Sequence, residues 1–391
     1  MSAPLILGLV LTFGHADGRT LQLTVTLAEP ATAALDWGDL RLAKAQAERR
    51  HVFTDLPAPA DRAVPYRLRA GQERRAELVQ PLLGPTLKVG LYGDSRDGPG
   101  PHQVLVEALT AWGPQVVVHT GDVVHQAGDE AGWSQHLAAS LPLSARVPVI
   151  LAVGNHELWQ PWDLPPEKRR DAVAEVLAQI PAPVDPLARS FGLGAHVFHV
   201  RIGGHLFVSL DSNDDLGPGS PQLRFLEAAL AQPDAQTRFV ALHHGPLSSG
   251  PHGGHPQAEA LIQVVERGRV TAVLSGHDHL YERLGRGSVA YLVSGGGGAP
   301  LYPRDRYTLG SVAFASIYHW VALELSGPTV GVAAYSLEGV LLDQAQLPPS
   351  DDPTRLQAAR LPWLGAGAGV LALVLVGALL SLALARRPGS G

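Results

Sequence analysis

Five strand-like segments of this sequence each end in polar residues of the kinds that bind divalent metals. The segments are "LKVGLYGDSR", "QVVVHTGDVVH", "VPVILAVGNHE", "RFVALHHG" and "VTAVLSGHDH". A single Gly-Asp or His after a strand is usually a turn or a hydrogen-bonded loop residue, so each motif is weak by itself. Side chains past the carboxyl ends of strands in an α/β sheet converge on one crevice, however, and five such endings together predict a metal site. Its candidate ligands are Asp94, Asp122, Asn155, His243, His277 and His279.

The number of ligands favours two metal ions rather than one. The two carboxylate oxygens of Asp122 can bridge a pair of ions. His277 and His279 alternate along the chain, so that one can reach each ion. Asn155 and His243 then complete the ion on the His277 side and leave room for water.

The second ion is one ligand short in this assignment. It receives Asp94, Asp122 and His279, whereas the position two residues after Asp94, which often carries a histidine ligand, is Arg96. His125 lies three residues past Asp122 in "GDVVH", close enough in sequence to bend back toward the same ion. We predict that His125 replaces the absent ligand; the alternative is that it is an ordinary loop residue.

Such a pair of ions predicts hydrolysis of phosphate esters. Two divalent ions about 3.5–4 Å apart activate a water or hydroxide for in-line attack on phosphorus and stabilise the developing charge. His156 is placed to donate a hydrogen bond to the phosphate or a proton to the leaving oxygen. Arg96 suits a bidentate clamp on phosphate oxygens, although a surface salt bridge explains it equally well. His252 and His255 in "SSGPHGGH" are candidates for protonating the leaving group, or residues of a solvated loop.

Other chemistries are excluded or disfavoured by composition and motifs. The 391 residues include no cysteine, which rules out thiolate metal sites, cysteine nucleophiles and disulfides. The net charge of −6 gives no basic field for nucleic acid. The segment "SGGGGAP" lacks the Gly-Lys-Ser/Thr ending of a nucleotide P-loop, so its glycines are expected to let the chain pass close to the metal crevice. The "GxSxG" pattern of α/β-hydrolases does not occur.

Two patterns of secondary structure divide the chain. Residues from about 5 to 80 alternate apolar and polar in short runs such as "LQLTVTL" and "VPYRLRAG", which predicts a small antiparallel β sandwich. From Leu87 onward, apolar strands alternate with candidate helices such as "HQVLVEALTAW", "RRDAVAEVLAQI" and "SPQLRFLEAALAQ". This alternation predicts an α/β domain with sheets buried between helices.

The C-terminal region reads as a membrane anchor. Residues 364–385, "LGAGAGVLALVLVGALLSLALA", carry no charge and are followed by Arg386 and Arg387. A helix of this length spans about 33 Å, enough for a bilayer core of about 30 Å. The alternatives are a buried core helix and a sorting tail that is later cleaved. The Arg pair predicts a cytoplasmic C-terminus and a catalytic domain on the extracytoplasmic (periplasmic) side.

The N-terminus leaves that orientation open. "PLILGLVLTFGHADG" reads either as a short signal peptide without a basic n-region or as the first strand of the β domain. Without a signal peptide, the chain would be a tail-anchored cytoplasmic enzyme.

The motifs resemble those of the calcineurin-like metallophosphoesterases. "GDSR", "GDVVH", "GNHE", "LHHGP" and "GHDH" occur in that family's order within residues 87–346, and "SLDSN" and "YLVSGGGGAP" also fit. Within this superfamily the chain is similar to the purple acid phosphatase branch, which carries a fibronectin-like β domain in front; "AALDWG" and "HVFTDL" resemble its last strands. The branch places a tyrosine three residues after the bridging Asp, and its ligation to ferric iron gives the colour. Here that residue is His125, so we expect a colourless enzyme that uses manganese, zinc or ferrous iron.

The resemblance implies an α/β fold with a four-layer metallophosphoesterase β-sandwich flanked by helices. We expect a fibronectin-like domain at 1–83, a catalytic domain at 84–346, a linker at 347–362 and a transmembrane helix at 363–385. The expected activity is phosphate ester hydrolysis by a dinuclear site. The alternatives are a phosphodiesterase rather than a monoesterase, and a membrane-tethered binding or scaffold protein with a decayed site.

Overall fold

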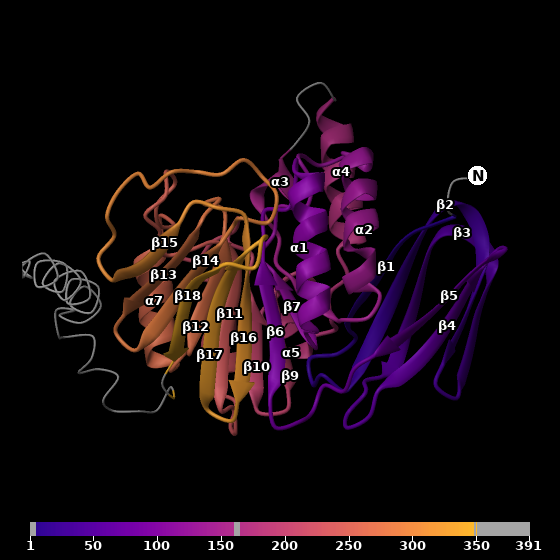
Figure 1. The fold of residues 1–391 in the computed structure, drawn as a ribbon, viewed down its shortest axis with the longest axis horizontal. Helices are drawn as coiled ribbons and strands as arrows, with labels where there is room; N and C mark the ends of the chain where they lie inside the picture. The colour runs from indigo at the N-terminus through magenta and orange to yellow at the C-terminus, as the bar shows by residue number, and fades with distance from the viewer. Residues whose placement is uncertain (1–4, 160–164, 348, 350–391) are drawn as a thin grey trace, which may run out of the picture. The chain divides into compact units, whose positions relative to one another are not determined.

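The structure of the chain is a computed structural model that describes residues 5–159, 165–347 and 349. Three β-sheets and seven helices account for this part of the chain. The sheets have five, seven and six strands (Figure 1).

The N-terminal region forms one antiparallel sheet. Its strands are β1 (Ile6–Phe13), β2 (Thr20–Trp37), β3 (Leu40–Pro57), β4 (Val64–Ala70) and β5 (Glu73–Val79). They are ordered β1-β2-β4-β5, with β3 along the other edge of β2. The described residues of this region form a single hydrogen-bonded sheet, so the β sandwich predicted at 1–83 is not confirmed. The segment that also read as a signal peptide forms strand β1.

The buried face of this sheet packs against the part of the chain that follows it instead of a second sheet of its own. Trp37 and Tyr66 stack with ring centroids 5.4 Å apart and belong to the same hydrophobic core as strands of the six- and seven-stranded sheets. The Tyr66 hydroxyl donates a 2.7 Å hydrogen bond to the carbonyl of Ala145, and Arg146 pairs with Glu77. A sheet that shares a core with its neighbour does not need a second layer to bury its apolar face.

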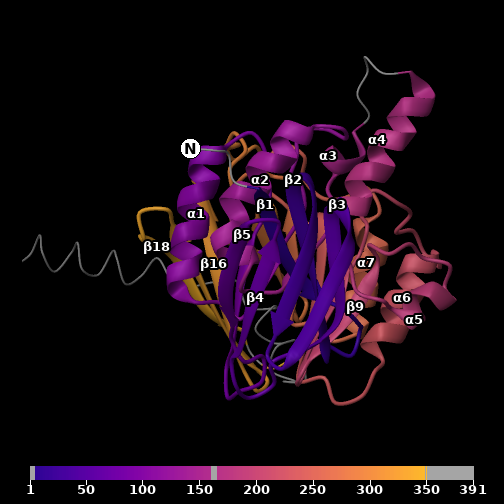
Figure 2. The same ribbon diagram turned by 90° about the vertical axis from the view of Figure 1, so that its right-hand side faces the viewer.

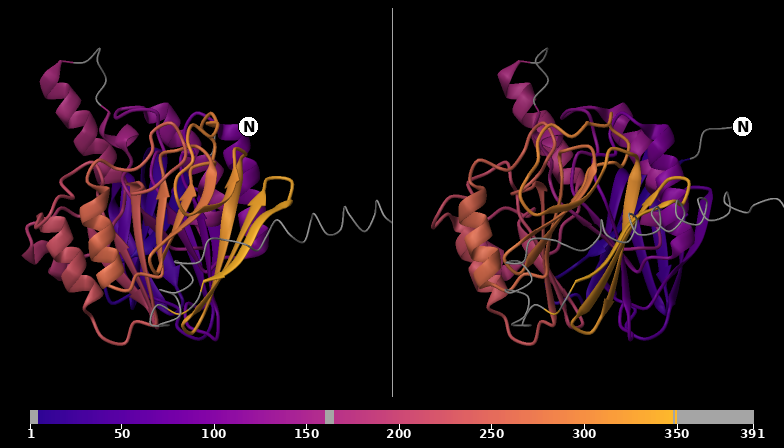
Figure 3. Two further views of the ribbon diagram at one scale, coloured as in Figure 1. Left: turned by 90° about the vertical axis from the view of Figure 1, so that its left-hand side faces the viewer. Right: turned by 60° about the vertical axis from the view of Figure 1, so that its left-hand side comes forward.

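The part of the chain that follows β5 is a sandwich of two sheets. The six-stranded sheet has the order β18-β17-β16-β6-β7-β8. Its strands are β6 (Leu87–Tyr92), β7 (Val116–His119), β8 (Val149–Leu151), β16 (His319–Ser326), β17 (Thr329–Ser336) and β18 (Leu341–Leu347). Figure 3 shows how the last strands of the chain, in yellow, lie beside the orange strands of the other sheet.

The seven-stranded sheet has the order β15-β13-β14-β12-β11-β10-β9. Its strands are β9 (Phe198–Ile202), β10 (His205–Ser209), β11 (Thr237–His244), β12 (Ala272–Gly276), β13 (Tyr281–Arg286), β14 (Val289–Ser294) and β15 (Ser311–Ala315). Alternate residues of both sheets meet in the central core, among them Val118, Val321, Phe239 and Leu274.

Helices cover the outer faces of the two sheets. Helices α1 (Pro99–Trp112) and α2 (Glu130–Ser144) supply apolar residues to a core with β6, β7 and β16 (Figure 1). Helices α6 (Pro221–Leu230) and α7 (Ala258–Arg267) do the same for the seven-stranded sheet (Figure 2). The remaining helices are α3 (Asn155–Leu158), α4 (Pro166–Gln179) and α5 (Pro186–Ser190). The order helix, sheet, sheet, helix confirms the predicted layered α/β architecture.

The predicted membrane anchor at 363–385 lies outside the described residues, as does nearly all of the linker at 347–362. Of the helices that the structure does describe, none is long and apolar enough to cross a bilayer.

The strands that carry the predicted ligands run parallel within each sheet. Strands β6, β7 and β8 pair in parallel, and so do β10, β11, β12 and β14. The carboxyl ends of each parallel set therefore face one edge of its sheet, which brings the five polar endings to the same rim.

Candidate metal centre

Two buried carboxylates form the base of the site. Asp94 follows β6 and Asp122 follows β7, and both side chains are almost fully shielded from solvent. Both residues have left-handed backbone, with φ of 57° and 60°, as does His277 after β12, with φ of 69°. Non-glycine residues adopt this region at an energetic cost, and such strain gathers at functional sites. The sharp turns after the strands aim these side chains into the crevice.

His243 faces the carboxylates with one ring nitrogen and the backbone with the other. Its Nδ1 lies 2.8 Å from the carbonyl oxygen of Thr120, which fixes Nδ1 as the protonated nitrogen. Its Nε2 lies 3.4 Å from Oδ1 of Asp122 and 2.9 Å from Oδ1 of Asn155. Metal-binding histidines are oriented in this way, with the distal nitrogen bonded to a carbonyl and the other lone pair free.

His279 repeats this arrangement beside the other carboxylate. Its Nδ1 lies 2.6 Å from the carbonyl oxygen of Pro300, and its Nε2 lies 3.5 Å from Oδ1 of Asp94. The backbone N–H of His277 donates to both oxygens of Asp94, at 3.1 and 3.0 Å. The His277 ring itself lies toward His243, with ring centroids 5.0 Å apart. The two histidines of "GHDH" are thus divided between the two sides of the site, as the alternation predicts.

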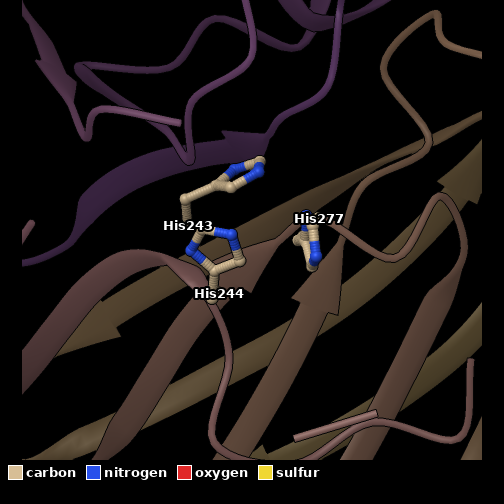
Figure 4. Close-up of side chains that lie close together, drawn as sticks. All are labelled: His243, His244 and His277. Carbon is tan, nitrogen blue, oxygen red and sulfur yellow. The ribbon is translucent and has the colours of Figure 1, made fainter. Parts of the chain in front are cut away.

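A fourth imidazole, which is not among the predicted ligands, joins the cluster. The His244 ring lies 4.2 Å from the His277 ring and 4.9 Å from the His243 ring (Figure 4). Ligand atoms of these three histidines all lie within 4.8 Å of one another, and so do those of a second group, Asp94, Asp122 and His243. The Ser212 hydroxyl lies 2.9 Å from Nδ1 of His244 and holds the ring in this orientation.

Glu157 organises the loops without facing the crevice, and it too was missed. This fully buried carboxylate accepts backbone N–H groups of Asp122, Val123 and Val124 after β7, and of Gly154 after β8. Burial and the nearby carboxylate of Asp122 raise the pKa of Glu157 to about 7, against the effect of these N–H donors. The only sequence signal for it was its position in "GNHE".

Close packing of glycines around the ligands supports a built site. A Cβ at Gly154 would lie 2.1 Å from Oδ1 of Asp122, and one at Gly276 would lie 2.3 Å from Oδ2 of Asp94. The glycine run 294–300 also passes the site, as expected: Ala299 donates its N–H to the carbonyl of Asp94 at 2.8 Å. Larger residues at these positions would displace the carboxylates.

Arg96 lies at the edge of the cluster and is largely buried. Its Nε lies 3.3 Å from Oδ2 of Asp122, and its Nη1 pairs with Asp97. Burial alone would lower the pKa of Arg96, but Asp122 and Asp97 outweigh burial and raise it. The guanidinium therefore stays charged beside the carboxylates. It forms ion pairs with the partly exposed Asp97 and the buried Asp122, and its role as a phosphate clamp stays a prediction.

The structure does not bring His125 into the cluster. Its Nδ1 lies 3.0 and 3.1 Å from the two oxygens of Asp97, and half of its side chain is exposed. Acting as a metal ligand would require His125 to leave Asp97 and turn inward. Its replacement of the ligand absent at Arg96 stays a prediction.

Two of the three predicted proton donors, His156 and His252, lie on different sides of the crevice. His156 bonds the carbonyl of His125 through Nδ1, and its Nε2 lies 3.8 Å from Oδ2 of Asp122. Burial lowers the pKa of His156, although Asp122 acts in the opposite direction. His252 lies on the far side, with Nδ1 2.9 Å from Oδ1 of Asp278 and its ring 4.2 Å from that of His277. Tyr302, which no sequence signal marked, stacks on His279 with centroids 4.1 Å apart.

The donor set fits divalent cations. Two carboxylates in a buried site would repel each other strongly unless cations offset their charge. Neutral imidazole nitrogens and carboxylate oxygens are the ligands that zinc, manganese and iron accept. With Nδ1 of His243 and of His279 bonded to backbone carbonyls, Nε2 of each ring faces the carboxylates and is the nitrogen that a cation would reach.

The sequence of residues 87–281 matches the family described as Calcineurin-like phosphoesterase. The chain belongs to this family, in its purple acid phosphatase-like branch. A probable purple acid phosphatase 20 of Arabidopsis thaliana is 26% identical over 189 residues, which are 46% of this chain and 43% of that protein. A nucleotide pyrophosphatase/phosphodiesterase of Hordeum vulgare is 28% identical over 195 residues, or 46% of this chain and 50% of that protein. The chain thus spans about half the length of these curated relatives.

Other relatives at similar distance are named inactive. A probable inactive purple acid phosphatase 27 of Arabidopsis thaliana is 26% identical over 43% of this chain and 29% of its own length. Membership of the phosphoesterase family therefore does not by itself establish turnover.

Solved structures support the fold over most of the chain. The purple acid phosphatase PPD1 from yellow lupin (Lupinus luteus) seeds superposes with a TM-score of 0.74 at 16% identity, covering 92% of this chain and 77% of that one. A structure of PhoD gives a TM-score of 0.67 at 13% identity, covering 88% and 93%. The predicted metallophosphoesterase fold of the catalytic part is thereby confirmed.

Proposed function

We propose that this protein hydrolyses phosphate esters at a site for two divalent metal ions. The observation that carries the proposal is the paired arrangement of carboxylates and oriented histidines: Asp122 with His243 on one side, Asp94 with His279 on the other. Asp94, Asp122 and His279 would hold one ion. Asp122, Asn155, His243 and His277 would hold the other, with His244 close by.

Divalent ions at such a site supply Lewis acidity, which lowers the pKa of water and offsets the charge of the phosphate. The protein's own residues hold and orient the ester. Arg96 keeps a permanent positive charge at the edge of the cluster and is suited to bind a phosphate oxygen once cations balance Asp122.

His156 is the residue best placed to transfer a proton. Because its Nδ1 is committed to the carbonyl of His125, proton exchange takes place at Nε2, which faces the cluster. In the protonated state Nε2–H donates to a phosphate oxygen or to the leaving oxygen. His252, held by Asp278 on the opposite side, is the second candidate for protonating the leaving group.

The test of the site is the metal content of the purified protein together with hydrolysis of p-nitrophenyl phosphate in the presence of manganese, zinc or ferrous iron. We expect bound metal, turnover that a chelator abolishes, and restoration by added cation. If the protein neither binds these ions nor hydrolyses the ester, the result would instead support a binding or scaffold role. Relatives that are named inactive make this the alternative to test.

Diester hydrolysis is a second candidate within the same chemistry. The relative from barley is named a nucleotide pyrophosphatase/phosphodiesterase. Parallel assays with bis(p-nitrophenyl) phosphate and p-nitrophenyl phosphate separate the two activities, because a diesterase releases p-nitrophenol faster from the bis-ester.

The metals are expected to give no colour, since His125 stands where the purple enzymes have their tyrosine. The visible spectrum of iron-loaded protein tests this. An intense tyrosinate band would contradict it, and the Tyr302→Phe variant would show whether the ring stacked on His279 is its source.

Membrane attachment through residues 363–385, with the catalytic domain outside the cytoplasm, is proposed from sequence alone. Sedimentation with membranes, lost on truncation after residue 360, and digestion of the catalytic domain by protease added outside an intact cytoplasmic membrane would support it.

A further inference from the structure

A polar cavity lies beside the carboxylate cluster and has no role in the chemistry described above. Its volume is about 160 Å³, and it is enclosed by the loops that follow β6 and β7 and by the start of α2. The residues that give it chemical character are Arg96, Asp97, His125, Asp129, Gln135 and His136. Arg96 joins it to the site, since its Nε lies 3.3 Å from Oδ2 of Asp122. An ester bound at the cluster would therefore have this cavity next to it.

The charged groups of the cavity favour hydrogen-bond donors as its occupant. Asp97 and Asp129 are acceptors, and Asp129 uses Oδ1 to cap α2 through the N–H of Gly132 at 2.8 Å. The one permanent cation among the lining residues, Arg96, is already paired with Asp97 and Asp122. A second anionic group would meet two carboxylates with no free positive charge to balance it.

His136 gives the cavity a wall that presents an aromatic ring. Both of its nitrogens are engaged, Nδ1 with the hydroxyl of Ser95 at 3.1 Å and Nε2 with that of Ser140 at 3.3 Å. The ring stacks on His102, with centroids 5.0 Å apart and an angle of 12° between the planes. This wall therefore offers packing. Polar groups for an occupant come from Asp129 and Gln135, and from Asp97, whose oxygens also bond Arg96 and His125.

We propose that the cavity binds the alcohol portion of the phosphate ester, and that this alcohol is small, carries further hydroxyl or ammonium groups, and has no second anionic group. The inference rests on the proposed function and specifies its substrate class. The cavity volume of about 160 Å³ has room for a small polyol or amino alcohol.

The test compares four small esters on the full chain loaded with metal. Glycerol 2-phosphate and phosphoethanolamine carry extra donors, ethyl phosphate carries none, and phosphoglycolate carries a second anion. We expect kcat/KM for at least one of the first two to exceed that for ethyl phosphate by tenfold or more, with phosphoglycolate the poorest. Which of the two leads distinguishes hydroxyl from ammonium recognition.

A variant that fills the cavity with a larger side chain tests whether the preference among these esters depends on the cavity. Ala131 lines it from the first turn of α2, so Ala131→Leu should remove the preference through KM while hydrolysis of ethyl phosphate persists. Ala138→Leu, at another exposed alanine of the same helix outside the cavity, should keep the preference.

Two results would overturn the inference alone: turnover of p-nitrophenyl phosphate without any preference among the four esters, or a preference that survives Ala131→Leu. No turnover of any ester with any divalent ion would instead overturn the proposed function, and this inference with it.

Discussion

Nε2 of His243 lies 3.4 Å from Oδ1 of Asp122, while Nδ1 of the same ring lies 2.8 Å from the carbonyl oxygen of Thr120. The carbonyl comes from the residue just after β7, and Asp122 follows two residues later. One short turn therefore both supplies the carboxylate and sets the tautomer of the histidine that faces it.

Replacing His243 by Gln removes a ligand and its anchoring bond together. We expect the bound metal to fall from about two ions per chain to one and kcat to fall on the order of 100-fold or more, since even outer-shell changes cost 10–100-fold. Metal analysis and initial rates measure both. His205→Gln is the control, because His205 is a buried histidine on β10 bonded to Thr237. Equal metal loss in the two variants would show a general effect of losing a buried imidazole.

Glu157→Gln tests whether this carboxylate holds the loops after β7 and β8 together. In the wild type, backbone N–H groups donate to both oxygens of the Glu157 carboxylate. The glutamine amide replaces one of these oxygens by an NH₂ group, so some of the backbone N–H groups lose their acceptor. We expect a loss of about 2–4 kcal/mol in the free energy of unfolding and a weaker affinity for metal. Urea denaturation with and without cation measures these effects. Glu227→Gln, which breaks an exposed pair with Arg267, should change stability by less than about 1 kcal/mol. Equal losses of stability in Glu157→Gln and Glu227→Gln would show that Glu157 does not hold the two loops together.

His125→Ala decides between the ligand predicted from sequence and the pairing in the structure. Because His125 bonds Asp97 and is half exposed, we expect the variant to keep two ions per chain and to bind substrate more weakly. Loss of one ion, with Arg96 unchanged, would show that His125 turns inward to ligate metal.

Much of the fold and the grouping of most candidate ligands could be predicted because both depend on local patterns. The apolar run 87–92 is strand β6, and the polar endings of β6, β7, β8, β11 and β12 do converge. The central pair of Asp94 and Asp122 follows from parallel strands whose ends share one edge.

Other features depend on contacts that no local pattern encodes. Strict alternation along β11 would turn His244 away from His243, but the pairing of β11 with β12 shifts register between Ala241 and His244. The first sheet has no partner sheet because its core is completed by distant residues, as the bond from Tyr66 to Ala145 shows. Helix α2 was not predicted, since Gly132 and Pro142 interrupt its pattern.

Asp185 provides a pH-dependent contribution to stability away from the metals. Burial opposes its ionisation, but the ring and backbone of His199 and the N–H of Ala188 outweigh burial and hold the pKa of Asp185 below its ordinary value. A carboxyl with a depressed folded-state pKa stabilises the fold above its unfolded value of about 3.9, and that stability is lost as the pH falls through the folded value.

Asp185→Asn should therefore cost about 1–3 kcal/mol at pH 7 and progressively less below pH 4. Urea unfolding of both proteins at pH 7, 5 and 3 gives the difference, and contributions of the metal-site carboxylates cancel because both proteins contain them. A difference that stays constant across this range would contradict the assignment.

The central claim is that Asp122 and the residues around it hold two divalent ions at a site where phosphate esters are hydrolysed. The most direct measurement is the metal content of the purified chain alongside its hydrolysis of p-nitrophenyl phosphate, for the wild type and Asp122→Asn, with circular dichroism to confirm folding. We predict about two ions per wild-type chain with turnover, and loss of both metal and turnover in a folded variant. A wild-type chain that binds no divalent ion and shows no turnover, or a folded Asp122→Asn variant that retains both, would contradict it.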